Sequence, residues 1–578
     1  MWRLKVVLLS SCVGAAGWAG NVMTTSPAAA ALPRCNAAFL SKLQVHNVTI
    51  TSAVDTPAAA GTPEFCNVVG SVVTHGEGAG DGLANFRLQL PAVWNNRFLF
   101  LGCGGECGSI NSVSAEVDDT NEALPEGYAV VNTDTGHTDP TDAWTLLVPG
   151  VPNTPALTDF FYRAIHETTL ATKEMVEGYY KGNIEHAYFD GCSTGGRQAL
   201  MEADRNPDDF DGIIAGDPVM AFPETLLGHL NNLKIFAPAA SYFPAATLAA
   251  VDTAVKASCD KADGVADGLA QNPASCSFDP DSLVPGTLTK TQADAFKAYL
   301  SPITDTDGNL VFPGYSETDL ATVAFLGTWT EEACPAVPGT GPDPWSGETT
   351  PGCNPAGPSG LGFSQPLIAT MTELNPNFDV WDNFPFNNGV ISEAGLKALH
   401  ETMGAASSDQ PEAARGFLQR GGKLIMYHGF SDPSVSPYRS ISFYNSLARL
   451  EGGLSKLQRS ARLFMVPGMG HCQGGPGPNT FDTLGALDAW VSRGKAPDGI
   501  VATNTGTGRT MPLCKYPEQA SFVGGDVNSA GSWTCRATDT RMLDVGLDGE
   551  LAHAQATFGG HGDHGDQDHQ GGRGQNAQ

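Results

Sequence analysis

Basic residues are scarce in this chain. Its 578 residues include 32 Lys and Arg against 62 Asp and Glu, which gives a formal net charge of −30. This balance argues against nucleic acid or an anionic membrane surface as partner, because both attract positively charged proteins. After the N-terminal region, no uninterrupted apolar run approaches the length of a membrane span. We therefore expect no nucleic-acid partner and no membrane insertion of the mature chain.

Two cofactor signatures are also absent. The chain has 13 cysteines but no CxxC pair, the spacing typical of structural zinc sites, and we expect no zinc. The glycine loop 102–108, GCGGECG, has neither the lysine of a P-loop nor the G-x-G-x-x-G spacing of a dinucleotide site. Phosphate binding by this loop is therefore a weak interpretation, and we expect no organic cofactor.

The N-terminus has the pattern of a secretory signal peptide. Two basic residues precede an apolar run over 6–20, and small residues lead to Ala31. We assign residues 1–31 to the signal, with cleavage near Ala31, and expect the mature protein to be secreted. A lipoprotein signal ending at Cys12 is an alternative, but the apolar run continues well past that residue.

The cysteine count agrees with export. Removal of Cys12 with the signal leaves twelve of the 13 cysteines, and an even number in an exported chain favours disulfides. Local spacing suggests five pairs. They are Cys35–Cys66, Cys103–Cys107, Cys259–Cys276, Cys334–Cys353 and Cys514–Cys535.

Short apolar runs alternate with helix-forming segments along much of the chain. This alternation is typical of a mostly parallel sheet with helices on both faces, and the predicted fold class is α/β. The predicted strands are 97–102, 128–134, 186–191, 211–217, 423–429 and 461–468, and the predicted helices include 161–180, 195–204 and 438–451.

A change of composition between 221 and 415 indicates an insertion. Pro, Gly and Thr become more frequent there and the strand signal fades. We interpret 221–415 as a lid domain on a catalytic core formed by 32–220 and 416–545. Residues 546–578 end in a polar, low-complexity stretch and are predicted to be disordered.

The most informative motif is the G-x-S-x-G pentapeptide at 191–195. A strand-like run precedes it and a helix-forming run follows it, which predicts a nucleophile elbow with the hydroxyl of Ser193 projecting from a tight turn. Glycines are needed because a strained elbow leaves no room for Cβ atoms. In a chain with 68 glycines the pentapeptide also arises by chance, so its context carries the prediction.

Two further residues complete a catalytic constellation. Asp432 and His471 each follow a predicted strand, and they give the chain order Ser, Asp, His that is usual in α/β-hydrolases. We expect His471 to take the Ser193 proton and Asp432 to orient the imidazole. Taken singly, the alternatives are a turn before Pro433 and a structural loop histidine.

The oxyanion of an acyl-transfer reaction needs two backbone N–H donors. Thr194 follows the nucleophile and is expected to supply one. The other is expected from the glycine loop, at Gly104 or Gly105.

Cys192 and Cys472 adjoin the predicted nucleophile and base. If Ser193 and His471 touch, the two sulfur atoms lie within a few ångström of bridging distance. A disulfide there would tie the elbow to the histidine loop. Two buried thiols are the alternative.

As a set, these motifs resemble those of the tannase/feruloyl esterase family, whose CS, D and HC motifs match Cys192-Ser193, Asp432 and His471-Cys472. The resemblance implies an α/β-hydrolase core, a large lid that carries substrate selectivity, and a Cys192–Cys472 bond. The matching segments span nearly the whole mature chain: NTDTGH (132–137), RAIHETT (163–169), GCSTGGRQAL (191–200), FDGIIAGDP (210–218), HGFSDPSVSP (428–437) and VPGMGHC (466–472).

The resemblance also implies a structural calcium ion in the lid, at the loop 259–269. Its implied ligands are the side chains of Asp260, Asp263 and Asp267 and the backbone carbonyls of Val265 and Leu269. Carboxylates this close together, on a loop bent by two glycines, suit a hard oxygen-seeking cation, although the spacing is not that of an EF-hand. A solvated acidic turn is the alternative.

The sequence thus predicts a secreted serine carboxylesterase that cleaves esters of hydroxy-aromatic acids through an acyl-enzyme. Small aromatic or plant cell-wall esters of the feruloyl type are the first expectation, galloyl esters the second and a synthetic aromatic monoester the third. Trp329, Trp345 and Phe363 are candidates to contact the acid, or equally to form the core of the lid. A binding protein on a non-catalytic hydrolase scaffold is the rival from another class.

Overall fold

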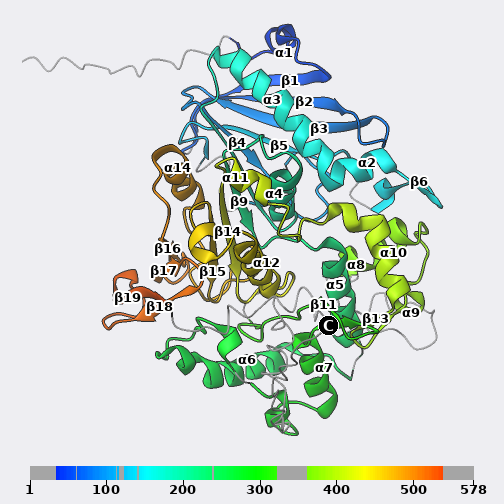
Figure 1. The fold of residues 1–578 in the computed structure, drawn as a ribbon, viewed down its shortest axis with the longest axis vertical. Coiled ribbons are helices and arrows are strands. Elements are labelled where there is room, and N and C mark those ends of the chain that lie inside the picture. The colour runs from blue at the N-terminus through cyan, green and yellow to red at the C-terminus, as the bar shows by residue number, and fades with distance from the viewer. Residues whose placement is uncertain are drawn as a thin grey trace, which may run out of the picture.

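A nine-stranded sheet forms the centre of the computed structural model (Figure 1). The structure describes residues 34–321 and 361–537, except 60, 112, 116–122, 139–141, 237, 239 and 277. Several predictions concern segments outside the described residues. These are the signal peptide 1–31, the tail 546–578, the pair Cys334–Cys353, and the lid candidates Trp329 and Trp345.

Six neighbouring strands of the central sheet run parallel, in the order β5-β4-β8-β9-β14-β15. Each coincides with one of the predicted strands, and the α/β fold class is confirmed. Their bounds are β4 (Arg97–Leu101), β5 (Ala129–Thr133), β8 (His186–Cys192), β9 (Gly212–Gly216), β14 (Lys423–Gly429) and β15 (Ala461–Val466).

Both faces of the parallel part are buried, which explains why these strands are almost continuously apolar. Phe98 and Phe100 of β4 point into one core cluster, whereas Leu99 and Leu101 point into another. The first cluster includes residues of α3 (Ala164–Tyr180), α4 (Thr194–Arg205) and α12 (Pro437–Leu450), and the second includes residues of α14 (Thr483–Arg493).

Three strands that we did not predict extend the sheet at one edge. β1 (Val48–Thr56), β2 (Phe65–Thr74) and β3 (Gly82–Pro91) pair antiparallel, and β3 joins β5. Helix α3 packs on β2, β3 and β5, as Figure 1 shows. In β2 buried and partly exposed residues alternate, as expected for an antiparallel strand with one solvated face.

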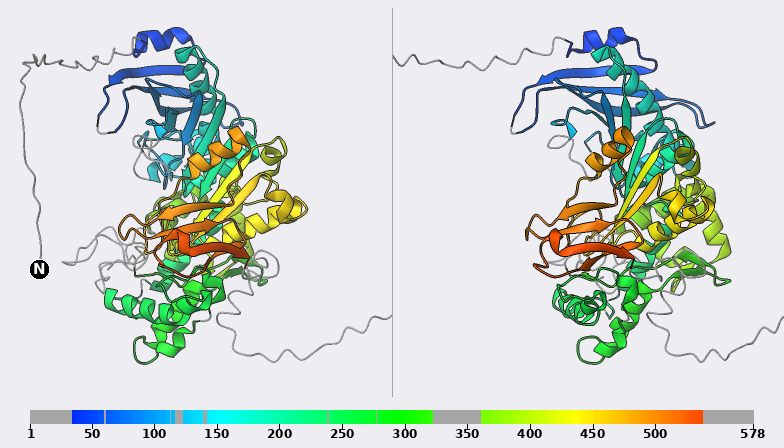
Figure 2. Two further views of the ribbon diagram at one scale, coloured as in Figure 1. Left: turned by 90° about the vertical axis from the view of Figure 1, so that its left-hand side faces the viewer. Right: turned by 60° about the vertical axis from the view of Figure 1, so that its left-hand side comes forward.

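The segment between β9 and β14 forms a second layer. Its hydrophobic cluster also includes residues of the segment between β5 and β8, among them Trp144 and Phe160. The green helices of the second layer lie at the end of the molecule away from β1–β3 (Figures 1 and 2). It contains α5 (Phe222–Phe236), α6 (Ala245–Cys259), α7 (Lys290–Leu300), α8 (Leu361–Leu367), α9 (Val380–Asn383), α10 (Glu393–Met403) and a sheet of order β11 (Leu310–Phe312), β10 (Ile303–Asp305), β13 (Val390–Ile391), β12 (Phe386–Asn387). These strands are only two or three residues long, in keeping with the faded strand signal. The following helix α11 (Arg415–Gln419) buries Phe417 in the core under the main sheet.

Two hairpins follow α14 near the C-terminus. They are β16 (Gly499–Thr503) with β17 (Thr510–Cys514), and β18 (Glu518–Phe522) with β19 (Trp533–Ala537). Among the described residues, none of the helices combines the length and apolar composition needed to cross a bilayer. Four of the locally predicted disulfides are present: Cys35–Cys66, Cys103–Cys107, Cys259–Cys276 and Cys514–Cys535.

Candidate active site

Ser193 lies at the turn between β8 and α4, at the N-terminus of the helix. Its φ of 64° and ψ of −122° are strained for a residue with a side chain. A Cβ atom on Gly191 would come within 2.5 Å of the carbonyl carbon of Gly195, and one on Gly195 within 2.8 Å of the Ser114 carbonyl oxygen. Only glycine fits these two positions, which gives the pentapeptide its physical basis.

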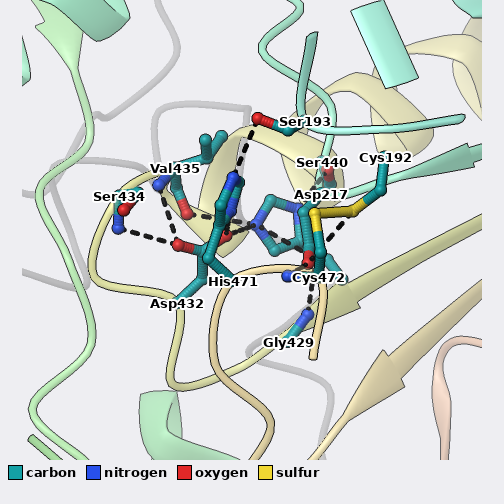
Figure 3. The surroundings of a disulfide bond; sticks show 11 residues. Cys192, Ser193, Asp217, Gly429, Asp432, Ser434, Val435, Ser440, His471 and Cys472 are labelled. Carbon is teal, nitrogen blue, oxygen red and sulfur yellow. Dashed lines mark hydrogen bonds and ion pairs between the residues drawn. A yellow bond between two sulfur atoms is a disulfide. The ribbon is translucent and has the colours of Figure 1, made fainter. Parts of the chain in front are cut away.

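The structure brings together Ser193, His471 and Asp432, although Ser193 and His471 are 278 residues apart (Figure 3). The His471 Nε2 lies 2.8 Å from the Ser193 Oγ, and its Nδ1 lies 2.6 Å from the Asp432 Oδ2. The other Asp432 oxygen, Oδ1, accepts the backbone N–H groups of Ser434 at 2.7 Å and Val435 at 2.9 Å. These bonds orient the carboxylate toward the imidazole.

A second histidine contacts the same carboxylate. His428, on β14, is fully buried, and its Nε2 lies 3.4 Å from the Asp432 Oδ2 and 3.1 Å from the Val435 carbonyl oxygen. Its Nδ1 lies 2.7 Å from the Ser440 Oγ. Our sequence analysis assigned no role to His428, and its place in the HGFSDPSVSP segment beside Asp432 was the available signal.

A buried carboxylate, that of Asp217, is hydrogen-bonded to the loops that follow β14 and β15. It accepts the backbone N–H of Gly429 at 2.7 Å and that of Cys472, and it lies 3.7 Å from the His428 Nε2. Burial raises the pKa of Asp217 to about 6, although the nearby His428 offsets part of this effect. The sequence analysis assigned no role to this residue either, although it lies in the matching segment FDGIIAGDP (210–218).

The charged groups of the site shift one another's pKa values. Burial alone would raise the pKa of Asp432, but His471 and His428 outweigh it and hold that pKa well below its usual range. Burial would likewise lower the pKa of His471, and the Asp432 carboxylate outweighs it and raises that pKa. A fixed anion therefore faces an imidazole whose protonated form it stabilises.

The predicted bond between Cys192 and Cys472 is present, with a Cα–Cα distance of 6.0 Å (Figure 3). It joins the residue before Ser193 to the residue after His471. The two loops that carry Ser193 and His471 are therefore covalently linked.

The expected oxyanion donors lie at one cavity of about 310 Å³, lined by Gly104, Gly105 and Thr194 together with Ser193 and His471. The Thr194 Oγ1 donates to the Gly105 carbonyl oxygen at 2.7 Å, which fixes the glycine loop against the elbow. Both glycines line the cavity, so the choice between them as second donor stays open.

The layer between β9 and β14 supplies the opposite wall of the cavity. Phe222, Leu226 and His229 of α5 and Leu367 of α8 line it. The His229 Nε2 contacts the Ser434 carbonyl oxygen at 2.8 Å, and burial lowers the pKa of His229 to about 4. This wall is thus mostly apolar, and its polar side chains are the neutral imidazole of His229 and the hydroxyl of Thr225. Phe363 also belongs to α8, but its side chain lies outside the described set.

The predicted calcium loop offers oxygen donors only. The Asp260 Oδ1 accepts the backbone N–H groups of Asp267 and Gly268, each at 2.9 Å, and this bends the loop so that two carboxylates lie near each other. The Asp267 carboxylate is buried and pairs with Arg509. Val265 and Leu269 belong to the same turn, and the Asp263 side chain lies outside the described residues. The carboxylate and carbonyl oxygens suit a hard cation. In this structure Arg509 pairs with the Asp267 Oδ2, and the Asp267 Oδ1 accepts the backbone N–H of Leu269 at 3.2 Å.

The strand order and the strand–elbow–helix unit define an α/β-hydrolase. The sequence pattern of the family described as tannase and feruloyl esterase matches residues 66–536. The chain therefore belongs to the tannase and feruloyl esterase family, and it is a carboxylic ester hydrolase.

Individual relatives agree with this assignment. The chain is 32% identical to mono(2-hydroxyethyl) terephthalate hydrolase of Piscinibacter sakaiensis, over 84% of this chain and 87% of that protein. It is also 32% identical to a probable feruloyl esterase of Arthroderma benhamiae, over 78% of this chain and 81% of that protein. The crystal structure of feruloyl esterase B from Aspergillus oryzae has the same fold, with a TM-score of 0.73 at 23% identity, over 87% of this chain and 100% of that one.

Proposed function

We propose that this protein is a secreted serine carboxylesterase that hydrolyses esters of hydroxy-aromatic acids through an acyl-enzyme. The observation that carries the proposal is the hydrogen-bonded chain from Ser193 through His471 to Asp432 at the wall of a cavity. Such a chain is the arrangement that activates a serine hydroxyl.

In this mechanism the His471 Nε2 removes the proton of Ser193 as its Oγ attacks the ester carbonyl carbon. Asp432 keeps the proton of the Nδ1 in place and stabilises the imidazolium. The Thr194 N–H and an N–H of Gly104 or Gly105 stabilise the oxyanion. His471 then protonates the leaving alcohol, and water, deprotonated by the same imidazole, releases the acid.

The acyl group is inferred from the size and lining of the cavity. About 310 Å³ with apolar walls from Phe222, Leu226 and Leu367 suits one aromatic acid better than a long aliphatic chain. Feruloyl-type esters are our first choice because several relatives are named feruloyl esterases. Galloyl esters are the alternative. The layer between β9 and β14 would act as the lid that carries this selectivity.

A panel of methyl ferulate, methyl gallate and p-nitrophenyl acetate tests the substrate class. We expect methyl ferulate to have the highest kcat/KM. A preference for short aliphatic acyl groups would reject the aromatic assignment. A fluorophosphonate probe tests the reaction itself: it should label the folded protein and not its Ser193→Ala variant. Absence of labelling in the wild type would favour a non-catalytic binding protein.

We also propose that the loop 259–269 binds a structural calcium ion, with Asp260, Asp263 and Asp267 as carboxylate ligands and the carbonyls of Val265 and Leu269 completing the set. The oxygen-only donors and the bent loop support this. Removal of the ion with EGTA should lower Tm by a few degrees, because an ion that binds only the folded state stabilises it. Readdition of Ca²⁺ should restore Tm, and the Asp260→Asn variant should not respond. An unchanged Tm in EGTA would count against the site.

Export is supported by the signal-like N-terminus and by the disulfides. N-terminal sequencing of protein from the culture medium should give a chain that starts near residue 32. Retention of residues 1–31 in the mature protein would contradict this.

A further inference from the structure

One wall of the cavity that holds Ser193 and His471 carries an acidic side chain, Glu106. This residue lies on the glycine loop, inside the short ring that the Cys103–Cys107 disulfide closes. Because that ring spans only a few residues, the backbone of Glu106 has little freedom. The carboxyl group is therefore held beside the proposed reacting groups.

Three contacts fix the surroundings of Glu106. The Trp144 Nε1 donates to its Oε2 at 3.2 Å, and its backbone carbonyl oxygen lies 2.7 Å from the His137 Nε2. The His137 and Trp144 rings stack on each other at 4.0 Å between centroids. A second carboxyl group, that of Asp142 on the 3-10 helix η3 (Asp142–Thr145), is hydrogen-bonded to Glu106. Glu106 and Asp142 thus form a carboxyl pair at the cavity.

Two carboxyl groups in contact cannot both ionise at neutral pH. Burial and the neighbouring Asp142 raise the pKa of Glu106 to about 8. Below that pH the pair keeps one proton and carries one negative charge. Above it, the pair carries two.

No lysine or arginine balances this charge among the described residues that line the cavity. The other titratable groups nearby are His137, on the loop after β5, which contacts the Glu106 backbone, and His229 of α5 and His471 after β15, which line the same cavity. Burial keeps His229 neutral. The Asp432 carboxylate, which raises the pKa of His471, balances the charge of that imidazole when it is protonated, and in the catalytically active form the imidazole is neutral. A carboxylate on a substrate would therefore meet the negative charge of the pair without an unpaired cation.

We propose that the Glu106–Asp142 pair selects substrates by charge: it accepts hydrogen bonds from hydroxyl groups of an uncharged ester and excludes esters that carry a free carboxylate. This inference rests on the proposed esterase function and narrows its substrate class. Hydroxyl-bearing phenolic or sugar esters fit the pair. The monoester of an aromatic diacid does not, because its carboxylate would be desolvated beside a like charge.

Three para-substituted methyl benzoates test the proposal on the acyl side. They carry a hydroxymethyl, a carbomethoxy or a free carboxylate group, and none of the substituents titrates between pH 6 and 9. The same substituents on benzyl acetate test the alcohol side. In at least one series the carboxylate ester should have a kcat/KM about tenfold or more below that of the neutral diester, mainly through KM. This gap should widen as pH rises through about 8, because Glu106 then loses its proton.

Variants separate hydrogen bonding from charge. Glu106→Gln keeps the size and the single charge of the pair, so it should match the wild type at pH 6.5 and lose the widening near pH 8. Glu106→Leu should lower the preference for the hydroxymethyl ester. The neutral double variant Glu106→Gln/Asp142→Asn should admit the carboxylate ester, with at least about a fivefold gain relative to the diester. The exposed Glu174 of α3 provides matched controls, and its Gln and Leu variants should change none of these ratios.

The results distinguish this proposal from the proposed function. If fluorophosphonate labels Ser193 and the esters are hydrolysed, but the carboxylate ester is cleaved as well as the diester in both series, charge selection is wrong and the esterase stands. Charge selection is equally wrong if the kcat/KM ratios between these esters are the same in Glu106→Leu and in the double variant as in the wild type. If no ester is hydrolysed and Ser193 is not labelled, both proposals fail.

Discussion

Two histidines contact the carboxylate of Asp432, and the charge of this carboxylate outweighs burial and raises the pKa of His471. The Asp432 Oδ2 lies 2.6 Å from the His471 Nδ1 and 3.4 Å from the His428 Nε2. The Asp432 Oδ1 accepts hydrogen bonds from two backbone N–H groups. The carboxylate is thus ionised and fixed in direction, and its charge holds a proton on His471 to a higher pH than usual.

The pH profile should report this directly. A general base must be neutral to accept the proton of Ser193, so a raised pKa of His471 moves the rising limb of kcat/KM above pH 6.5. In Asp432→Asn the anion is lost, and the limb should shift to lower pH while kcat falls by about 10⁴-fold. Initial rates with an activated phenolic ester between pH 5 and 9 measure both effects.

The partly exposed Asp305, the last residue of β10, supplies the control. Its Asn variant should leave the limb and kcat unchanged. An Asp432→Asn enzyme with near-normal kcat would show that another group orients His471.

At the scale of elements, the site depends on two loops that belong to different strands. The elbow follows β8 and the histidine loop follows β15, and the two strands are not neighbours in the sheet. The Cys192–Cys472 disulfide links these two loops covalently, although the two cysteines are 280 residues apart in the sequence. Asp217 adds backbone hydrogen bonds to the β14 and histidine loops.

Removal of this disulfide should affect catalysis more than removal of another one. In the Cys192→Ser/Cys472→Ser variant we expect kcat to fall at least about tenfold, because a small displacement of His471 misaligns the proton transfer. In the chain-entropy model the free energy of unfolding falls by about 5 kcal/mol. Kinetics and denaturant unfolding measure the two effects separately.

Cys35→Ser/Cys66→Ser is the matched control, since that bond ties the N-terminal segment to β2. It should reduce stability and leave kcat unchanged. Equal kcat values in the two double variants would show that the Cys192–Cys472 bond has no role in positioning.

At the scale of the whole molecule, the parallel strands were predictable because burial on both faces leaves a continuous apolar signal. The strands β1–β3 were not predictable, because many of their residues are partly exposed and they lack a continuous apolar run. The residues that meet at the site were predictable from the elbow motif and from their order along the chain. The contacts of His428, Asp217 and the Glu106–Asp142 pair were not predictable, because they depend on how distant loops pack. The segments HGFSDPSVSP and FDGIIAGDP contain His428 and Asp217 but do not say which groups these residues meet.

The stability of the whole chain should also depend on Glu317, a buried acid distant in sequence from Ser193, Asp432 and His471. Glu317 is fully buried, and its carboxyl lies within 4.8 Å of the sulfur atoms of Cys259 and Cys276. Burial raises the pKa of Glu317 to about 8, and its own backbone N–H offsets only part of the effect. The pKa of Glu317 is thus higher in the folded protein than in the unfolded chain. The contribution of this residue to the free energy of unfolding is therefore most favourable below about pH 4.5, and it is lost as pH rises toward 8.

Glu317→Gln removes this titration while keeping the size of the side chain. The variant should be more stable than the wild type at pH 8, by up to about 5 kcal/mol at 1.4 kcal/mol per pH unit, and the difference should shrink toward pH 5. Urea unfolding of both proteins at intervals from pH 5 to 8 measures it, with Glu174→Gln as the exposed control. A difference that does not vary with pH would mean that Glu317 is ionised in the folded protein, and a cationic partner for it would then have to lie close to the Cys259–Cys276 disulfide.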